Sequence, residues 1–341
     1  MTLVFTLCSN NYLAQAITLG DSLLLFNPGY VFKIGLVDKK NDEINYSSIP
    51  FEIIEVEKIP IKKFEEMFRR YNITELNTAV KPFYFKYFLN SFPGAVNIIY
   101  LDPDILVYNN FKELEKALHE FEIVITPHFT TPINDDKWQA ENDFLNSGLY
   151  NLGFLALKKG EESVKLIEWW ADRLETKAHI DFAKGMFTDQ LWMNFAPLYF
   201  NNVHIFRHPG YNMAYWNLHE RHLEDGDRVL KDGLSFLLVF FHFSGYNPLN
   251  PGLLSEYQDR FSFENRNDII EKFKDYSGSL FKSGYNSYSQ VPCYYAIEKK
   301  RVELEAYQSY KKTIPFYKRL IRGVILRFIK LFRVNIDYYT T

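Results

Sequence analysis

Residues 97–108, NIIYLDPDILVY, constrain the fold of this chain more than any other segment. Residues 97–101 are apolar, aromatic or β-branched after the first position, which is typical of a buried strand. The strand runs into Asp102-Pro103-Asp104, and a proline cannot donate a hydrogen bond to a sheet. Because residues two apart in an extended chain point the same way, both carboxylates leave the strand on one side. Such a pair fits either a divalent cation with open positions or an acidic turn between two strands.

A second Asp-x-Asp sequence, Asp225-Gly226-Asp227, shows what the surrounding residues add. It lies in the polar run HLEDGDRVLKDG, and no apolar strand leads into it. We therefore interpret it as a solvated turn. The first pair differs because apolar segments flank it on both sides.

The first half of the chain alternates strand and helix patterns. Apolar runs predict strands over 3–7, 31–37, 51–56 and 97–101. Helical spacing predicts helices over 12–26, 61–71 and 74–92, the last interrupted or started at Pro82. This alternation predicts an α/β fold in which helices cover both faces of an open sheet. Ligands collect at the carboxyl ends of the strands in such sheets.

The second half is less regular. We predict strands over 121–126, 154–157, 203–206 and 234–243, a helix over 161–174 and the start of another over 189–195. The last of these strands delivers His242 into a turn that contains Gly245. From about residue 250 onward the pattern becomes helical, so we divide the chain into a catalytic domain, 1–250, and a helical extension, 251–341.

Composition excludes several classes of protein. The chain of 341 residues is 47% hydrophobic and 18% aromatic, which supplies a sizeable core. A net charge of −3 argues against general nucleic-acid binding, and we expect no nucleic-acid partner. The two cysteines form neither a disulfide framework nor a zinc site by themselves, which favours a reducing cytosol. The run 234–243 is too short to span a bilayer, which needs about 20 residues.

Six segments occur in an order typical of one protein family. They are FTLCSNNYLAQAITLGDSL, AVKPFYFKYFL, YLDPDILV, NLGFLAL, TDQLWMN and HFSG. In these segments the chain resembles nucleotide-sugar-dependent glycosyltransferases of the GT-A fold, especially the group containing glycogenin and bacterial lipopolysaccharide galactosyltransferases. The resemblance covers residues 3–246. It implies a Rossmann-like mixed sheet with helices on both faces, followed by the helical C-terminal extension.

The resemblance also implies roles for individual residues. Asp102, Asp104 and His242 would hold Mn²⁺ or Mg²⁺, and an imidazole ligand favours manganese. A lone histidine near a strand end is otherwise structural. The remaining contacts with a UDP-sugar would come from Thr6, Cys8, Asn11, Tyr12, Lys81, Asp102, Asn151 and Gly245. The alternatives are an ordinary strand-to-helix turn for residues 6–12 and a solvated helix lysine for Lys81.

Catalytic roles fall on Asp189 and Gln190. By resemblance, the Gln190 amide would lie near the anomeric carbon and Asp189 would bind hydroxyls of the donor sugar, which implies transfer with retention. A helix start with Thr188 as its N-cap explains the same residues, and both readings can hold together. Inversion would instead need a carboxylate base for the acceptor hydroxyl.

Three departures from the family pattern concern the base and the acceptor. Cys8 and Ser9 stand where acidic residues are common, and Lys81 replaces an arginine, which gives a point charge instead of a fork. The lysine that often follows the late His-x-x-Gly is replaced by Tyr246.

Two further segments bear on the acceptor. Aromatic and amide side chains that suit either sugar recognition or a packed core are Tyr211, Asn212, Tyr215, Trp216 and Asn217. Residues 311–335 interleave apolar and basic side chains without any acidic residue. This pattern predicts an amphipathic helix on an anionic membrane surface, or a helix docked on the domain.

The sequence therefore predicts a metal-dependent glycosyltransferase (hexosyltransferase) that moves a sugar from a UDP-sugar to a glycan or lipid-linked saccharide. We expect it to act in bacterial surface polysaccharide or lipopolysaccharide synthesis, in the cytoplasm and peripheral on the inner face of the membrane. A nucleotide-sugar-binding protein or donor hydrolase is the alternative. A nucleotidyltransferase would need a Gly-rich basic loop after the first strand, and residues 8–11 contain neither Gly nor Lys.

Overall fold

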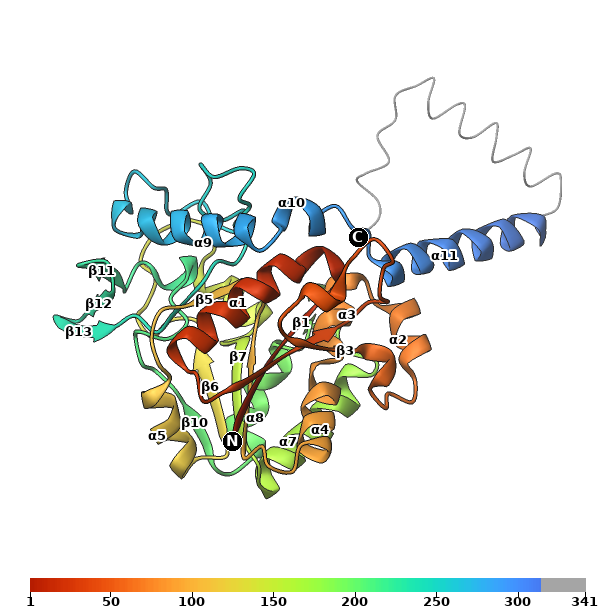
Figure 1. Cartoon of the computed structure of the whole chain (residues 1–341), viewed down its shortest axis with the longest axis horizontal. Helices are drawn as coiled ribbons and strands as arrows, with labels where there is room; N and C mark the ends of the chain where they lie inside the picture. Colours follow the sequence, from red (N-terminus) through yellow and green to blue (C-terminus); the bar gives the residue numbers. More distant parts are fainter. Residues whose placement is uncertain (314–341) are drawn as a thin grey trace. The chain divides into compact units, whose positions relative to one another are not determined.

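A mixed sheet forms the centre of the computed structural model, which describes residues 1–313 (Figure 1). In spatial order its seven strands are β10 (Val203–Ile205), β6 (Ile123–Pro127), β7 (Tyr150–Lys158), β4 (Asn97–Leu101), β1 (Thr2–Cys8), β2 (Val31–Leu36) and β3 (Glu52–Glu55). The strand β7 runs antiparallel to β4 and β6, and the other neighbours are parallel. The predicted α/β fold with a mixed sheet of the GT-A type is confirmed.

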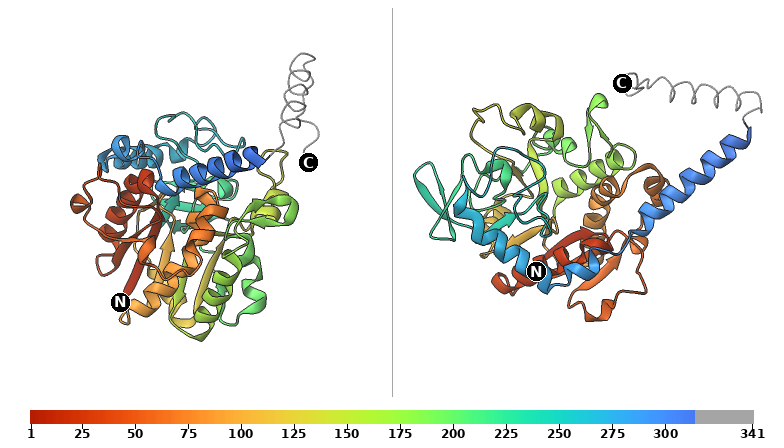
Figure 2. Two further views of the ribbon diagram at one scale, coloured as in Figure 1. Left: turned by 90° about the vertical axis from the view of Figure 1, so that its right-hand side faces the viewer. Right: turned by 90° about the horizontal axis from the view of Figure 1, so that it is seen from above.

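Helices cover both faces of this sheet, as the two views of Figure 2 show. One face packs against α4 (Lys81–Ser91) and α7 (Glu161–Leu174). The other packs against α1 (Leu13–Phe26) and α5 (Lys112–Glu120). The shorter helices are α2 (Phe64–Arg70), α3 (Ile73–Ala79), α6 (Glu141–Ser147) and α8 (Ala196–Tyr199).

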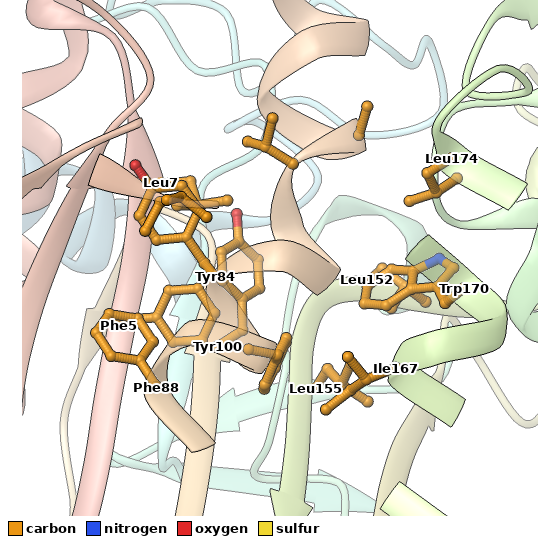
Figure 3. Close-up of a cluster of buried hydrophobic side chains, with 14 of the residues drawn as sticks. Phe5, Leu7, Tyr84, Phe88, Tyr100, Leu152, Leu155, Ile167, Trp170 and Leu174 are labelled. Carbon is orange, nitrogen blue, oxygen red and sulfur yellow. The ribbon is translucent and has the colours of Figure 1, made fainter. Parts of the chain in front are cut away.

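Aromatic side chains fill the core under α4 (Figure 3). The ring of Phe5 on β1 lies 4.8 Å from Phe85, 4.9 Å from Phe88 and 5.2 Å from Tyr100, measured between centroids. Each fully buried aromatic of this kind stabilises the fold by about 1.5–3 kcal/mol. Because Tyr100 lies near the end of β4, this packing also fixes the point at which the Asp pair leaves the sheet.

The helix predicted over 74–92 is two helices. Asn72 caps α3, since its side chain accepts from Glu75 N, and the carboxylate of Glu75 accepts from Asn72 N in return. A new helix, α4, then begins at Lys81, with Pro82 in its first turn. Proline is tolerated there because the first N–H groups of a helix have no partner within the helix.

The single strand predicted over 234–243 is wrong. β13 (Leu234–Leu237) joins β11 (His222–Glu224) and β12 (Arg228–Lys231) in an outer sheet, whereas β14 (Phe240–His242) pairs with β5 (Ile105–Val107). The chain changes sheets between them because Leu238 N donates to Asp227 O at 2.8 Å and Val239 N donates to Gly210 O at 2.7 Å. Continuous hydrophobicity in the sequence hides this change of partner.

Other predictions shift by a few residues. The strand predicted over 154–157 begins at Tyr150, so Asn151 and Gly153 lie inside β7. Residues 191–195 form a 3₁₀ helix. Asp225 and Gly226 have positive φ in the turn between β11 and β12, which confirms the solvated-turn interpretation of the second Asp-x-Asp.

The C-terminal region contains the predicted helices, but they begin only after residue 266, because residues 251–266 form turns and loops. α9 (Ile270–Lys282) and α10 (Tyr285–Tyr288) belong to the compact unit Met1–Tyr295, and a second unit begins at Ala296 within α11 (Tyr294–Thr313). The domain boundary predicted after residue 250 stays a prediction. No helix within residues 1–313 is long and apolar enough to cross a membrane. The amphipathic segment predicted over 311–335 lies almost wholly outside the described residues.

Candidate metal and donor-binding site

Backbone pairing brings His242 to the two aspartates. β4 ends at Leu101, and Asp102 N still donates to Gly153 O at 2.8 Å. After the turn, β5 pairs with β14 so that Ile105 lies opposite His242, and Phe243 N donates to Asp104 O at 2.8 Å. Residues far apart in the sequence are therefore placed side by side by main-chain hydrogen bonds.

The three side chains converge closely. His242 Nε2 lies 2.9 Å from Asp104 Oδ1 and 3.8 Å from Asp102 Oδ2. One ligand atom from each residue lies within 4.8 Å of the other two, and no other such group of three occurs among residues 1–313. Two carboxylate oxygens and an imidazole nitrogen fit a divalent cation that keeps positions for further ligands.

The electrostatics of the cluster formed by Asp102, Asp104 and His242 favour the binding of a cation. Burial lowers the pKa of His242, but Asp104 and Asp102 together outweigh it, and the net shift is upward. Burial and the neighbouring Asp104 raise the pKa of Asp102, against the opposing effects of Lys81 and His242. Both shifts arise because negative charges are crowded in a desolvated site. A divalent cation would relieve this repulsion.

The hydroxyl group of Tyr100 orients the carboxylate of Asp102. The Tyr100 hydroxyl donates to Asp102 Oδ1 at 2.5 Å, which leaves Oδ2 on the side of His242. Tyr100 and Asp102 are two residues apart on an extended strand, so their side chains emerge on the same side. This spacing is the sequence signal that could have identified Tyr100 as part of the site.

A cavity of about 600 Å³ adjoins the three residues. Its lining includes Asp102, Asp104 and His242, together with Lys81, Asp189 and Gln190. The predicted metal ligands and the predicted catalytic residues therefore share one cavity. Asn151 lines it as well.

Lys81 is buried, and the alternative of a solvated lysine is wrong. The side chains of Lys81 and Asp189 are 2% and 3% exposed, and Lys81 Nζ lies 2.6 Å from Asp189 Oδ2. The same ammonium donates to Leu152 O at 2.9 Å and lies 4.1 Å from the Tyr100 ring centroid. Its contact with a nucleotide stays a prediction, because here its charge is balanced by Asp189.

The Gln190 amide is fixed at both ends. Its Nε2 donates to Ser147 O at 2.9 Å, and its Oε1 accepts from Leu152 N at 3.2 Å. Thr188, which comes two residues before Gln190, has φ of 42°, a conformation that strains a β-branched residue. Thr188 is not a helix N-cap; it turns the chain so that the two following side chains face the cavity.

The turn after β1 is placed differently from the residues above. Thr6, Cys8, Asn11 and Tyr12 do not line the cavity, and Thr6 and Cys8 are buried in the core. Burial and then Asp38 raise the pKa of the Cys8 thiol. Tyr12 is 45% exposed, and burial followed by the charge of Asp104 raises its pKa to about 12. The predicted nucleotide contacts of these residues stay predictions.

Asn10 and Asp38 were not anticipated. Asn10 Nδ2 donates to Asp38 Oδ2 at 3.0 Å, and Tyr46 OH donates to Asn10 Oδ1 at 2.6 Å. Asp38 also accepts from Tyr294 N at 2.8 Å. These contacts shape the turn after β1, but they join residues too far apart for a sequence pattern to reveal.

The predicted acceptor residues divide into two groups. Tyr215 and Trp216 line the cavity. Tyr211, Asn212 and Asn217 are fully buried and do not line it. Gly245 has φ of 73°, and a Cβ there would lie 2.5 Å from Ser255 Oγ, so its glycine serves the turn after β14.

Comparison with known proteins agrees with this arrangement. Two proteins of Bacillus subtilis (strain 168) are similar to this chain. They are uncharacterized protein YfnF, 31% identical over 177 residues (49% of this chain, 55% of that protein), and uncharacterized protein YfnD, 22% identical over 174 residues (49% and 52%). The chain thus spans about half the length of the curated relatives it matches.

The solved structures to which this chain is similar include those of two glycosyltransferases. Galactosyltransferase LgtC in complex with donor and acceptor sugar analogs is 15% identical, with 82% of this chain and 96% of that chain covered and a TM-score of 0.45. Glycosyltransferase GlyE of Streptococcus pneumoniae TIGR4 is also 15% identical, with coverage of 86% and 65% and a TM-score of 0.45.

A family model decides the assignment. The model of glycosyl transferase family 8 matches residues 3–232, which is well over half of the chain and includes β1, β4 and the Asp pair. This chain belongs to glycosyl transferase family 8.

Proposed function

We propose that this protein is a metal-dependent glycosyltransferase that moves a sugar from a UDP-sugar to a glycan or lipid-linked saccharide. The observation that carries the proposal is the meeting of Asp102, Asp104 and His242 at the wall of the 600 Å³ cavity. Mn²⁺ or Mg²⁺ held by these residues would stabilise the negative charge of the departing diphosphate.

The residues of the chain have separate tasks in this proposal. The bond from the anomeric carbon to the diphosphate breaks, a bond to the acceptor oxygen forms, and the acceptor proton leaves with the diphosphate. Lys81 holds the carboxylate of Asp189 in place through their ion pair, and this carboxylate would accept hydrogen bonds from sugar hydroxyls. Gln190 presents a fixed amide to the same cavity. The fixed amide and the already paired Asp189 support transfer with retention.

The proposed metal site is tested by nucleotide binding. Calorimetric titration of UDP in the presence of Mn²⁺ should show binding to the wild-type chain and a loss of at least tenfold in affinity for Asp104→Ala. Asp227→Ala is the matched control, because it removes an aspartate from the other Asp-x-Asp sequence, in the turn between β11 and β12. Equal affinity of Asp104→Ala and wild type would contradict the metal site.

Transfer is tested separately from binding. The protein is incubated with radiolabelled UDP-sugars and membrane lipid extracts, and label in the lipid fraction is measured. Label in the lipid fraction supports a transferase, and the anomeric configuration of the product by NMR decides between retention and inversion. Release of free sugar without acceptor labelling would identify a donor hydrolase, and binding without turnover would identify a binding protein.

We further propose that the protein works on the inner face of a bacterial membrane, in surface polysaccharide synthesis. The support is the sequence of residues 311–335, in which basic and apolar side chains alternate without an acidic residue. Each basic residue near an anionic surface contributes about 1 kcal/mol. A chain that ends at Thr313 should bind UDP normally and no longer sediment with anionic vesicles. Continued sedimentation of the shortened chain would refute the membrane proposal.

A further inference from the structure

A line of buried polar side chains leads away from the back of the His242 ring. His242 Nδ1 lies 3.3 Å from Asn212 Oδ1, and Asn212 Nδ2 donates to Asn151 Oδ1 at 3.1 Å. Asn151 Nδ2 lies 3.3 Å from His128 Nε2, and His128 Nδ1 lies 3.1 Å from Leu149 O. All four side chains are buried. We call them the amide relay.

The Leu149 carbonyl sets the direction of every hydrogen bond in the relay. A carbonyl oxygen can only accept, so His128 Nδ1 must carry the proton. Burial lowers the pKa of His128 to about 4, so the ring is neutral and its Nε2 accepts from Asn151. The amide oxygen of Asn151 therefore faces Asn212. The amide oxygen of Asn212 in turn faces His242 and requires a proton on Nδ1.

The backbone of the relay is held as firmly as its side chains. Asn217 Nδ2 donates to both Asn212 O and His128 O at 2.9 Å, while its Oδ1 accepts from Ala214 N at 3.0 Å. Asn212 has φ of 55°, a left-handed conformation that asparagine tolerates better than most residues. A relay whose members are anchored in this way cannot reverse by simple rotation of one amide.

We infer that His128, Asn151 and Asn212 are positioning residues that hold His242 as its Nδ1–H tautomer, with the Nε2 electron pair directed at Asp102 and Asp104. An imidazole binds a cation through an unprotonated nitrogen, and the hydrogen bond made by the other nitrogen selects which one is free. The inference rests on the proposed metal-dependent function. It gives Asn151 a task different from the donor contact predicted for it.

The geometry at the other end of the relay fits this task. In the Nδ1–H tautomer, His242 Nε2 and Asp104 Oδ1 are both acceptors, yet they lie 2.9 Å apart. Two acceptors at this distance need a cation or a proton between them. Burying a polar side chain is also costly unless its donors and acceptors are hydrogen-bonded, and each residue of the relay is hydrogen-bonded to the next one.

The experiment measures the affinity of the full chain for Mn²⁺ alone by calorimetry. The variant His128→Phe removes the Nε2 acceptor but keeps a ring against Phe144 and Trp216, whose centroids lie 4.9 and 5.3 Å away. We expect its affinity to fall about tenfold, the lower end of losses seen for outer partners of metal ligands. His128→Gln, which offers an amide oxygen in place of Nε2, should stay within about threefold of wild type by the same reasoning.

Asn212 supplies a second pair of variants next to the metal ligand. Asn212→Gly keeps the left-handed backbone but removes the acceptor for His242, and we expect a loss of about 10- to 100-fold. Asn212→Asp keeps the acceptor for His242 Nδ1 but loses the donor to Asn151 Oδ1, so it should lose less affinity than Asn212→Gly. Thermal unfolding of each variant shows whether it is folded, and the His128 pair decides the matter if Asn212→Gly does not fold.

The outcomes separate the relay from the metal site itself. If Asp104→Ala abolishes Mn²⁺ binding but His128→Phe binds like wild type, or if His128→Phe and His128→Gln lose affinity equally, the relay is refuted and the metal site stands. If wild type does not bind Mn²⁺, both the relay and the proposed function are refuted. A selective loss in His128→Phe and Asn212→Gly supports the relay.

Discussion

A side chain at Gly153 would collide with three groups of the candidate site. A Cβ at this position would lie 2.4 Å from His242 Cε1, 2.7 Å from Asp102 Oδ2 and 2.9 Å from Asn151 Oδ1. These three groups are held by hydrogen bonds to other residues, so they cannot simply move aside. The absence of a side chain at this position is therefore a requirement of the site and not of the strand.

The substitution Gly153→Ala should disrupt the site more than the fold. Overpacking of this kind costs about 1–3 kcal/mol, and most of it would displace Asp102 and His242. We expect affinity for Mn²⁺ and UDP to fall at least tenfold while the protein stays folded, as measured by calorimetry and circular dichroism. Gly94→Ala is the matched control, because a Cβ at Gly94 meets nothing within 4 Å.

Lys81 and Asp189 depend on each other for stability. Removing one partner of a buried ion pair leaves an uncompensated charge and costs about 3–5 kcal/mol. We therefore expect Lys81→Met to lower the free energy of unfolding by about that amount in urea denaturation. Adding Asp189→Asn should restore part of the loss, whereas Lys86→Met, half-exposed on the same helix, should cost under about 1 kcal/mol. Additive losses in the double variant would contradict the pairing.

Single residues differ in how far the sequence reveals them. Asp102 and Asp104 could be predicted because they follow an apolar strand, whereas His242 was identified as a third ligand through the family resemblance, since a lone histidine near a strand end is otherwise structural. His128 gave no signal, since the loop that carries it has no period and its partners lie on other segments. Hydrogen bonds between loops depend on tertiary packing, which a linear pattern does not encode.

At the scale of elements, α3 connects the cavity with the turn after β1. Thr74 and Thr78 on this helix line the cavity, and Asn77 Nδ2 donates to Ser9 Oγ at 3.1 Å in the turn after β1. At its N-terminus, Glu75 accepts from Asn72 N through Oε2 and from Ile180 N through Oε1, both at 2.8 Å. Ile180 opens the short hairpin of β8 (Ile180–Asp181) and β9 (Met186–Phe187).

Glu75 should therefore matter more than the other half of the capping box. Losing the cap in Asn72→Ala costs about 1 kcal/mol. Glu75→Ala should cost about 1 kcal/mol more, because Ile180 N also loses its acceptor. Urea denaturation measures both values. Glu65→Ala on α2, whose ion pair is exposed, should cost under about 0.5 kcal/mol, and equal costs for Glu75→Ala and Asn72→Ala would show that the hairpin contact is unimportant.

Strands could be predicted from the sequence where one run of apolar residues belongs to a single sheet. β1, β2 and β4 are mainly apolar runs inside the mixed sheet, and their positions were predicted within a few residues. The run 234–243 serves two sheets, and hydrophobicity is the same on either side of the change. The sequence located the break between α3 and α4 only approximately, because Pro82 could either interrupt a helix or begin one.

At the scale of the whole molecule, buried charges couple stability to pH. Burial lowers the pKa of His128 to about 4. As the pH falls, His128 is therefore protonated in the unfolded chain before it is protonated in the folded protein. Burial opposes ionisation of Glu220, but Arg221, Lys231 and the Thr130 amide lower its pKa to about 2. Stability is thus present above the ordinary pKa of each group and is lost as the pH falls toward the folded value.

We expect the free energy of unfolding to decline in two stages. The first lies between pH 6.5 and about 4, where His128 contributes together with three histidines whose pKa values burial also lowers, His204, His208 and His222. The second lies between pH 4.5 and about 2 and belongs to Glu220. Urea denaturation at a series of pH values measures both, with His128→Phe expected to flatten the first stage and Glu220→Gln the second. A variant that keeps the full slope of its stage would show that another group causes the decline.

The pairing of β5 with β14 has a consequence for how the protein is made. Asp104 emerges early in synthesis, but His242 follows only after more than a hundred further residues have left the ribosome. Any fragment that stops before β14 lacks the imidazole that meets Asp102 and Asp104, and it leaves Ile105–Val107 without its partner strand. The three candidate metal ligands therefore come together only after β14 has docked, so a prematurely terminated product lacks the complete cluster of the proposed metal site.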